Sequence, residues 1–466
     1  MRIYSTLTRQ KEEFIPVHEG EVRIYACGPT VYNYFHIGNA RPFVVFDTLR
    51  RYLESRGYRV IYVQNFTDVD DKMIKRAREE GISVPRLAER FIAEYFKDAD
   101  GLGIRRATVH PRATEHIGDI IRLIETLIEK SHAYVSESDV YFDTQSFPAY
   151  GKLSGQDLAE LEAGARVEPG EKKRHPMDFV LWKAQKQQDE IAWDSPWGKG
   201  RPGWHIECSA MSMKYLGDTI DIHTGGQDLI FPHHENEIAQ SESATGKQFV
   251  KYWMHNGFLN VESKKMSKSE GNFFTVREVA EEFDLEAVRL FLLSAHYRSP
   301  INFSHKLMEQ SESALQRIKN SLENLSYIAR EGKTGAITDE ETALSAMMET
   351  QKKAFFEAMD DDLNTADALG AMFEAVREAN TVLSGGGTRT AAAKALEILD
   401  AMLAVLGLLQ GAREEGFPAE VAGLVEKRQQ ARKEKDFAEA DRIREELKTM
   451  GIILEDTPQG VKIKKM

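Results

Sequence analysis

The residues most suited to bind a metal ion gather near the middle of the chain. They include Cys208, which is one of only two cysteines, and the pair His233 and Glu237. Pro232 is expected at the first position of a helix, so side chains four residues apart just beyond it would project from one face. The other cysteine, Cys27, follows a predicted strand far upstream. Two thiolates, one imidazole and one carboxylate are all ligands that Zn²⁺ accepts in a tetrahedral site.

Each of these residues also has a simpler interpretation. Taken alone, two cysteines in 466 residues are more typical of inert, buried, small hydrophobic side chains than of metal ligands. A His–Glu pair four residues apart is also common on helix surfaces. The pattern of a helical metalloprotease is excluded, because Ile238 stands where that pattern requires its second histidine. The metal assignment therefore depends on the motifs around it.

The elements that must position these residues begin with a crossover unit. Strands are predicted at residues 22–26 and 58–65, with a helix at 42–55 between them. Strand, helix and strand in this order indicate a right-handed parallel crossover, and phosphates bind where such a helix begins. A further helix is predicted to run from the stretch at 67–72 to about residue 103.

The start of the first helix carries residues suited to a nucleotide. His36 can donate a hydrogen bond to an anionic phosphate, and Gly38 lacks the Cβ that would keep a flat base from the backbone. Asn39 follows directly. A capping turn with an incidental histidine fits these residues equally well.

Two later loops could complete a nucleotide site. Gly226 and Asp228 form a glycine turn with a carboxylate that could accept hydrogen bonds from ribose hydroxyls, although such turns are common without a ligand. Lys265 and Lys268 are three residues apart among serines and a glycine. They could close over a triphosphate and neutralise charge as pyrophosphate leaves. A solvated basic loop has the same composition.

Composition limits the class of protein. A chain of 466 residues that is 42% hydrophobic can bury a large core and divides into roughly three or four domains. No apolar run is long enough for a membrane span and the N-terminus lacks a signal-peptide core, so we expect a soluble, cytoplasmic protein. Two cysteines cannot form a disulfide framework, which agrees with a reducing compartment. The net charge of -13 argues against a general polyanion binder, so nucleic acid would need a local basic surface.

The remaining segments indicate further domains. Residues 110–199 change in character, with an amphipathic helix at 114–130 and strands such as 139–143, and are interpreted as an insertion. Residues 278–300 and most of 304–408 have helical patterns, the latter without a catalytic constellation.

The C-terminal tail differs from the rest of the chain in charge. Two helices and a hairpin are predicted there. Residues 421–466 hold 11 Lys or Arg and 9 Asp or Glu, a small basic excess with the sign needed for phosphate contacts. The cations offered for such contacts are Lys427, Arg428, Arg432, Lys433, Arg442 and Arg444.

Taken in this order, the motifs resemble the cysteinyl-tRNA synthetase family over essentially the whole chain. The segment 36–39 is similar to the HIGH signature, with Asn39 where that signature has histidine, and 265–269 matches the KMSKS signature letter for letter. Segments 111–117, 203–208 and 231–237 also resemble this family. The resemblance implies an α/β fold: a Rossmann-like parallel-sheet catalytic domain with an inserted α+β subdomain, then a helical bundle and a small C-terminal α+β domain.

The expected boundaries follow from the resemblance and the patterns together. They are the catalytic domain at 1–109 and 200–260, the inserted connective subdomain at 110–199, the KMSKS loop and stem-contact region at 261–303, the helical bundle at 304–411, and the anticodon-binding domain at 412–466.

The implied reaction is ATP-dependent ligation of L-cysteine to tRNA(Cys) through cysteinyl-adenylate, with release of AMP and pyrophosphate. One zinc ion per chain would select the cysteine thiolate, Mg²⁺ would accompany ATP, and the chain would act as a monomer without a membrane partner. The implied site residues are His36, Lys265 and Lys268 for catalysis; His36, Gly38, Asn39, Gly226, Asp228 and Lys268 for ATP; Cys27, Thr67, Trp204 and His223 for cysteine; and Cys27, Cys208, His233 and Glu237 for zinc.

Two alternatives remain at this point. A ligase that couples cysteine to an amino sugar through the same adenylate would share the catalytic domain but would not need an anticodon-reading tail. A non-enzymatic, zinc-stabilised RNA-binding protein would not need both phosphate motifs. No editing site is expected in residues 110–199, because a metal that binds thiolate already rejects serine.

Overall fold

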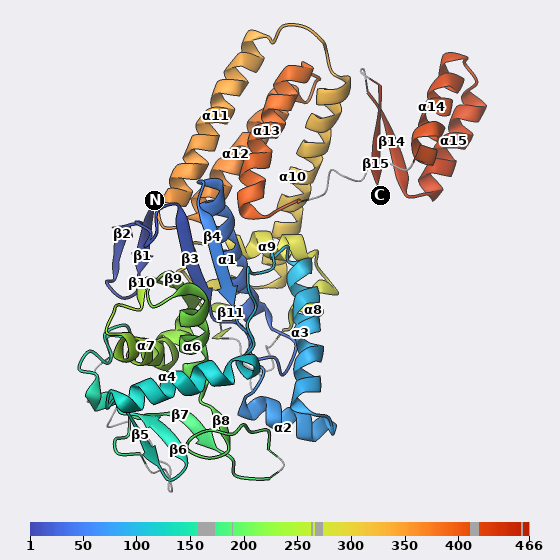
Figure 1. Cartoon of the computed structure of the whole chain (residues 1–466). Helices are drawn as coiled ribbons and strands as arrows, with labels where there is room; N and C mark the ends of the chain where they lie inside the picture. Colours follow the sequence, from blue (N-terminus) through green and yellow to red (C-terminus); the bar gives the residue numbers. More distant parts are fainter. Residues whose placement is uncertain are drawn as a thin grey trace. The chain divides into compact units, whose positions relative to one another are not determined.

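The computed structural model (Figure 1) describes residues 1–156, 173–188, 190–261, 264–265, 274–410, 419–457 and 460–465. The chain forms two compact units. The first comprises Met1–Glu312 and Glu357–Asp367, and the second comprises Ser313–Phe356 and Ala368–Met466.

A four-stranded parallel sheet forms the centre of the first unit, which confirms the predicted Rossmann-like layer. Its strands, in spatial order, are β10 (Val250–Asn256), β9 (Ile220–Gly226), β3 (Glu21–Ala26) and β4 (Arg59–Gln64). Ala26 of β3 lies opposite both Gln64 of β4 and Thr224 of β9. Because the strands are parallel and in this register, their carboxyl ends share one edge of the sheet.

The helix between β3 and β4, α1 (Ile37–Ser55), begins earlier than predicted. Pro42, the expected first residue, lies inside it. His36 is extended at the N-cap and makes no side-chain cap. Instead, the Ile37 amide donates to the carbonyl of Phe274 at 3.0 Å. The start of α1 is thus completed by a distant segment, which local sequence signals do not reveal.

This contact belongs to a short antiparallel ladder, called here the His36–Thr275 ladder. His36 pairs with Thr275 in an isolated bridge. The Val276 amide donates to the carbonyl of Phe35 at 3.1 Å. Thr275 also caps the next helix, α8 (Val276–Ala280). The segment that holds Lys265 and Lys268 is called here the lysine loop. The ladder therefore joins the 36–39 segment to the chain directly downstream of this loop.

The single helix predicted up to residue 103 is wrong. The structure has two helices there, α2 (Asp71–Glu80) and α3 (Val84–Gly101). Gly81 adopts a left-handed conformation with φ 64°, which ends α2, and the Ser83 side chain caps α3. A glycine C-cap followed by a serine N-cap is a stop and a new start.

The insertion is an α+β subdomain, as predicted. Helix α4 (Ile117–Glu129) buries Ile120, Ile124 and Leu127 in a core shared with Phe142 and Trp182. The antiparallel sheet on which it rests contains β5 (Ala133–Ser136), β6 (Asp139–Phe142), β7 (Phe179–Ala184) and β8 (Gly200–Pro202). Helices α6 (Trp204–Leu216) and α7 (Glu235–Thr245) pack on each other and on α4 (Figure 1).

The segment before α7 differs from its prediction. Pro232 is not the first residue of α7, because residues Ile230–His234 form a separate wide turn, η4. Phe231 is extended there (φ -134°, ψ 134°), which interrupts the helix. The expected proximity nevertheless holds, since His233 Nε2 lies 3.0 Å from Glu237 Oε1.

A second small sheet follows β10. It contains β12 (Lys264–Lys265), β11 (Leu259–Val261) and β13 (Ile301–Phe303) in that order. Only part of the predicted helical run at 278–300 is helical, as α8 and α9 (Leu285–Leu293). Asp284 breaks the run because its side chain accepts from the Glu286 amide and starts α9 anew.

One fully buried arginine holds this sheet to α1. Arg41 donates to the carbonyls of Gly257 (2.7 Å), Phe258 (3.0 Å), His296 (3.2 Å) and Ser299 (2.6 Å). Burial lowers the pKa of Arg41 to about 10, which leaves it charged at neutral pH. A planar guanidinium can serve several acceptors at once. The residue thus fixes the chain on both sides of the lysine loop.

The second unit contains most of a helical bundle. Its long helices are α10 (His305–Glu331), α11 (Asp339–Asp360), α12 (Thr365–Leu383) and α13 (Arg389–Leu406), as the bundle prediction requires. Glu341 accepts from the Thr388 amide at 2.6 Å and so ties α11 to the start of α13.

The C-terminal part has the predicted two helices and hairpin. They are α14 (Ala419–Lys433), α15 (Phe437–Thr449), β14 (Ile452–Thr457) and β15 (Gly460–Lys465). Arg428 was expected to contact phosphates, but its side chain is only 3% exposed. The other five basic residues named for this role are exposed. Across the part of the chain that the structure describes, no helix is long and apolar enough to cross a membrane.

The Arg41 contacts generate a stability prediction. Arg41→Lys should lower the melting temperature of the first unfolding transition by about 5 °C or more. An ammonium group cannot reach all four carbonyls, and each buried carbonyl left without a hydrogen bond costs roughly 1–3 kcal/mol. Arg59→Lys is the matched control, since the Arg59 side chain is 75% exposed. Scanning calorimetry compares the two variants, and equal melting temperatures would show that the Arg41 contacts add nothing.

Candidate active site

The candidate site lies where the central strands end. Cys27 follows β3 directly, and its amide donates to the Thr224 carbonyl of β9 at 3.3 Å. Thr67 follows β4, and its amide donates to the Pro29 carbonyl at 3.2 Å. His223 of β9 stands opposite Tyr25 of β3. Segments distant in sequence therefore meet at the carboxyl edge of the sheet, where open α/β sheets bind ligands.

The four predicted zinc ligands are brought together there. The donor atoms of Cys27, Cys208, His233 and Glu237 all lie within 4.8 Å of one another. The two sulfur atoms are 3.9 Å apart, and Cys27 Sγ is 3.6 Å from Glu237 Oε1. Donors about 2.0–2.3 Å from a tetrahedral ion stand roughly 3.3–3.8 Å from each other. The set therefore fits a zinc ion in donor type and spacing.

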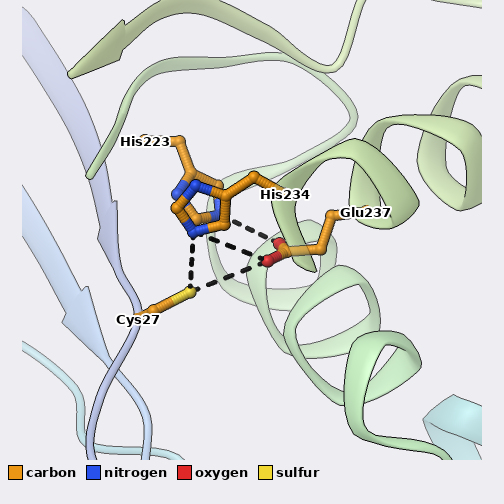
Figure 2. A group of neighbouring side chains, drawn as sticks. All are labelled: Cys27, His223, His234 and Glu237. Carbon is orange, nitrogen blue, oxygen red and sulfur yellow. Dashed lines mark hydrogen bonds and ion pairs between the residues drawn. The ribbon is translucent and has the colours of Figure 1, made fainter. Parts of the chain in front are cut away.

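A second set of four donors shares two of these residues. Figure 2 shows the rings of His223 and His234 facing the sulfur of Cys27 and the carboxylate of Glu237, and these donors also lie within 4.8 Å. His234 Nε2 is 3.3 Å from Cys27 Sγ, and His223 Nε2 is 2.9 Å from Glu237 Oε2. Because Cys27 and Glu237 belong to both sets, an ion at one set leaves the other incomplete.

The charges of the first set are strongly perturbed. Burial raises the pKa of Cys27 well above its usual range, while a hydrogen bond with Cys27 lowers the pKa of Cys208 to about 6. Burial alone would raise the pKa of Glu237, but His223 and His233 hold it at about 2. Burial opposes the charge of His233, yet Glu237 raises its pKa to about 10. A metal ion at this set must therefore displace the proton of His233.

Further histidines surround both sets. His205 Nδ1 lies 2.9 Å from His233 Nδ1, and His255 Nε2 lies 2.8 Å from His234 Nδ1. Burial lowers the pKa of His205 and of His234 well below the usual range, so both are neutral. Neutral rings in such contacts fix the orientation of their neighbours.

The residues predicted for the cysteine pocket lie around the donors. The Trp204 side chain is 42% exposed and stacks on the ring of His233, with centroids 4.2 Å apart. Thr67 is 2% exposed and His223 is fully buried. His223 thus contacts Glu237 from inside the protein, whereas the Trp204 side chain is partly exposed to solvent beside His233.

The structure describes most of the residues predicted to bind ATP. His36, Gly38 and Asn39 occupy the start of α1, and the N-terminal end of a helix favours anions. Gly226 ends β9, and a Cβ there would come within 2.3 Å of Asp228 Oδ1, so a larger residue would require that side chain to move. Asp228 itself is exposed.

The lysine loop is less completely described. Lys265 belongs to β12, where its backbone pairs with Asn260. Lys268 lies outside the residues that the structure describes.

Sequence reasoning missed several residues of this centre. His234 stands beside the predicted ligand His233, so the doubled histidine was a signal, but spacing alone does not say which ring faces inward. His205 lies in the quoted 203–208 segment. His255 of β10 offers no local signal, because only the pairing of β10 with β9 brings it near the site.

Family models match most of the chain. The model described as "tRNA synthetases class I (C) catalytic domain" matches residues 13–313. A DALR domain model matches 354–410, and the "Cysteinyl-tRNA ligase anticodon binding domain" model matches 414–463. The matches thus extend into the tail that an amino-sugar ligase would not need.

Two relatives align with this chain over its whole length. A cysteine–tRNA ligase of Caldicellulosiruptor saccharolyticus is 59% identical over 468 aligned residues, and one of Clostridioides difficile is 55% identical over 466. Each alignment covers 100% of both chains.

Solved structures share the fold at low identity. Mycobacterium tuberculosis methionyl-tRNA synthetase in complex with methionyl-adenylate has a TM-score of 0.61 at 17% identity, covering 83% of this chain and 89% of that one. The Agrobacterium radiobacter K84 LeuRS in a ternary complex with tRNA and LeuAMS has a TM-score of 0.61 at 12% identity, covering 87% and 88%.

The two donor sets can be separated by mutation. Cys208→Ser should weaken zinc binding by at least about a hundredfold, because it removes a thiolate that only the first set uses. His234→Asn, the matched control, should weaken zinc binding far less. Metal content after dialysis against a competing chelator measures both. The reverse order of losses would assign the ion to the second set.

Proposed function

Because the chain belongs to the cysteinyl-tRNA synthetase family, we propose that it selects its amino acid through one zinc ion held by Cys27, Cys208, His233 and Glu237. Its reaction is the ATP-dependent ligation of L-cysteine to tRNA. The observation that carries the zinc proposal is the convergence of these four donors within 4.8 Å. This set is preferred to the second because it offers two thiolates to a borderline-soft ion.

The outer contacts support the same choice. His223 Nε2 lies 2.9 Å from Glu237 Oε2, which leaves Oε1 toward Cys27 and His233. Such a contact holds a ligating carboxylate in one orientation. His223 is then a positioning residue for Glu237 as well as a wall of the cysteine pocket with Thr67.

Bound zinc would supply a soft electrophilic centre that prefers a thiolate to a hydroxyl, the group by which serine differs from cysteine. The site residues also have to hold cysteine so that its carboxylate faces ATP. Trp204 stacks on His233 and so forms one wall beside the donors. No editing site in residues 110–199 is needed for this selectivity.

The chemistry consists of two transfers. The cysteine carboxylate attacks the α-phosphate of ATP to give cysteinyl-adenylate and pyrophosphate; a terminal ribose hydroxyl of tRNA then takes the cysteinyl group, and AMP leaves. Both steps depend on positioning and charge stabilisation. We assign His36, Lys265 and Lys268 to the phosphates, where Mg²⁺ would accompany ATP, and Gly38, Asn39, Gly226 and Asp228 to adenosine.

The C-terminal part is the proposed anticodon reader for tRNA(Cys). Its exposed cations on α14 and α15, such as Arg432, Lys433 and Arg444, suit contacts with the RNA backbone. We also propose that the domain boundaries are those given in the sequence analysis, and that the enzyme is monomeric and cytoplasmic.

Substrate selection gives the direct test. Pyrophosphate exchange should depend on cysteine, with serine at least about a thousandfold less effective, because a metal-dependent choice rests on thiolate binding. Removal of the metal should abolish exchange, and added zinc should restore it. Comparable exchange with serine, or full activity without metal, would refute the zinc proposal.

Deletion of residues 412–466 separates the two transfers. Cysteine-dependent pyrophosphate exchange should stay near the full-length value, while transfer to tRNA falls by roughly two orders of magnitude or more, because backbone contacts dominate RNA affinity. Both rates are measured on the same preparation. Unchanged transfer would remove the tail from tRNA recognition, and equal loss of both would show that the catalytic part needs it to fold.

A further inference from the structure

One buried carboxylate beside the metal donors has an oxygen atom without a partner. Glu207 lies in the first turn of α6 and is 1% exposed. Its Oε2 atom is buried without a hydrogen-bond partner. Its side chain shares a hydrogen bond with Thr67. Among the described residues, no lysine or arginine forms an ion pair with it.

Two other buried carboxylates of the first unit have several partners. Asp47 forms ion pairs with Arg51 and Arg289, both at 2.7 Å. Glu235, the first residue of α7 and fully buried, accepts from three backbone amides of the insertion: those of Gly151, Leu153 and Ser154. A buried carboxylate without such partners is costly unless a ligand completes it.

The position of Glu207 points to the substrate pocket. Residues three and four apart share a helix face, so Glu207 and Cys208 lie on the same face of α6 as Trp204. Thr67, the hydroxyl partner of Glu207, is 3.5 Å from Asn65 Nδ2. Asn65 Oδ1 in turn lies 3.9 Å from Cys208 Sγ. The carboxylate and the sulfur donors therefore border one continuous polar cluster at the ends of β3 and β4.

We propose that Glu207, together with Thr67, binds the α-ammonium group of the cysteine substrate. This inference rests on the proposed function, in which the substrate sulfur lies at the donors that include Cys208. Cysteine carries its amine two carbons from its sulfur, so a substrate held by sulfur brings its cation close to the neighbouring residue of α6. The ammonium would supply the charge and donors that Oε2 lacks, and the substrate carboxylate would be left free to face ATP.

A purely structural role is the competing explanation. A carboxylate in the first turn of a helix is also stabilised by the helix N-terminus. In that case the side chain would not distinguish between ligands that carry an amine and ligands that do not.

Two thiols that each lack one substrate group make the distinction. Cysteamine has the thiol and the amine, whereas 3-mercaptopropionate has the thiol and the carboxylate. Both are used as competitive inhibitors of cysteine-dependent pyrophosphate exchange, with the wild type and with Glu207→Gln. Glu207→Gln should raise the inhibition constant of cysteamine by about tenfold to a hundredfold, the usual contribution of a charged hydrogen bond. Inhibition by 3-mercaptopropionate should change less than about threefold or improve, and zinc content should be unchanged.

Two further variants keep the test sharp. Glu235→Gln alters a buried carboxylate held by backbone amides, so it should affect both inhibitors equally and change mainly the melting temperature. Glu207→Asp retains the carboxylate on a shorter side chain. It should weaken inhibition by cysteamine less than Glu207→Gln does. It also provides the measurement if the glutamine variant does not fold.

The possible failures are distinguishable. Equal weakening of both inhibitors by Glu207→Gln, unchanged cysteamine inhibition, or loss of zinc would overturn the assignment of Glu207 and leave the proposed function in place. Absence of cysteine-dependent exchange in the wild type would overturn the proposed function and this inference together.

Discussion

The parallel pairing of β3 with β4 on one side and β9 on the other determines where the chemistry of this protein takes place. It brings Cys27, Thr67 and His223 to one edge of the sheet, although they come from three separate stretches of the chain. A shift of register by one residue would turn the side chains of a strand to its other face. The donors that α6 and α7 supply are useful only because this edge is fixed.

Three glutamates on neighbouring helices show how surroundings decide the role of one side chain. Glu237 is held ionised by histidines, Glu235 is satisfied by backbone amides, and Glu207 has the Thr67 hydroxyl but no cation among the described residues. All three are buried to nearly the same degree. Burial alone therefore says little about function, and the identity of the partners separates the proposed metal ligand, the structural acceptor and the proposed substrate anchor.

Much of this arrangement could be predicted because its signals are local. Strands 22–26 and 58–65 and the His233–Glu237 spacing depend on patterns within a few residues. The predictions were wrong or incomplete where tertiary contacts determine the position of a helix end or a side chain. The Phe274 carbonyl completes the first turn of α1, so the helix starts before Pro42. Likewise, strand pairing brings His255 to the site, and the burial of Arg428 depends on how α14 packs.

The backbone on each side of the lysine loop is held by contacts with other strands or helices, and the His36–Thr275 ladder supplies the downstream contact. Upstream, β12 pairs with β11, and downstream, Phe274 is bonded to Ile37. An insertion or deletion between Lys265 and Phe274 would therefore have to fit between two ends whose backbone contacts are already made.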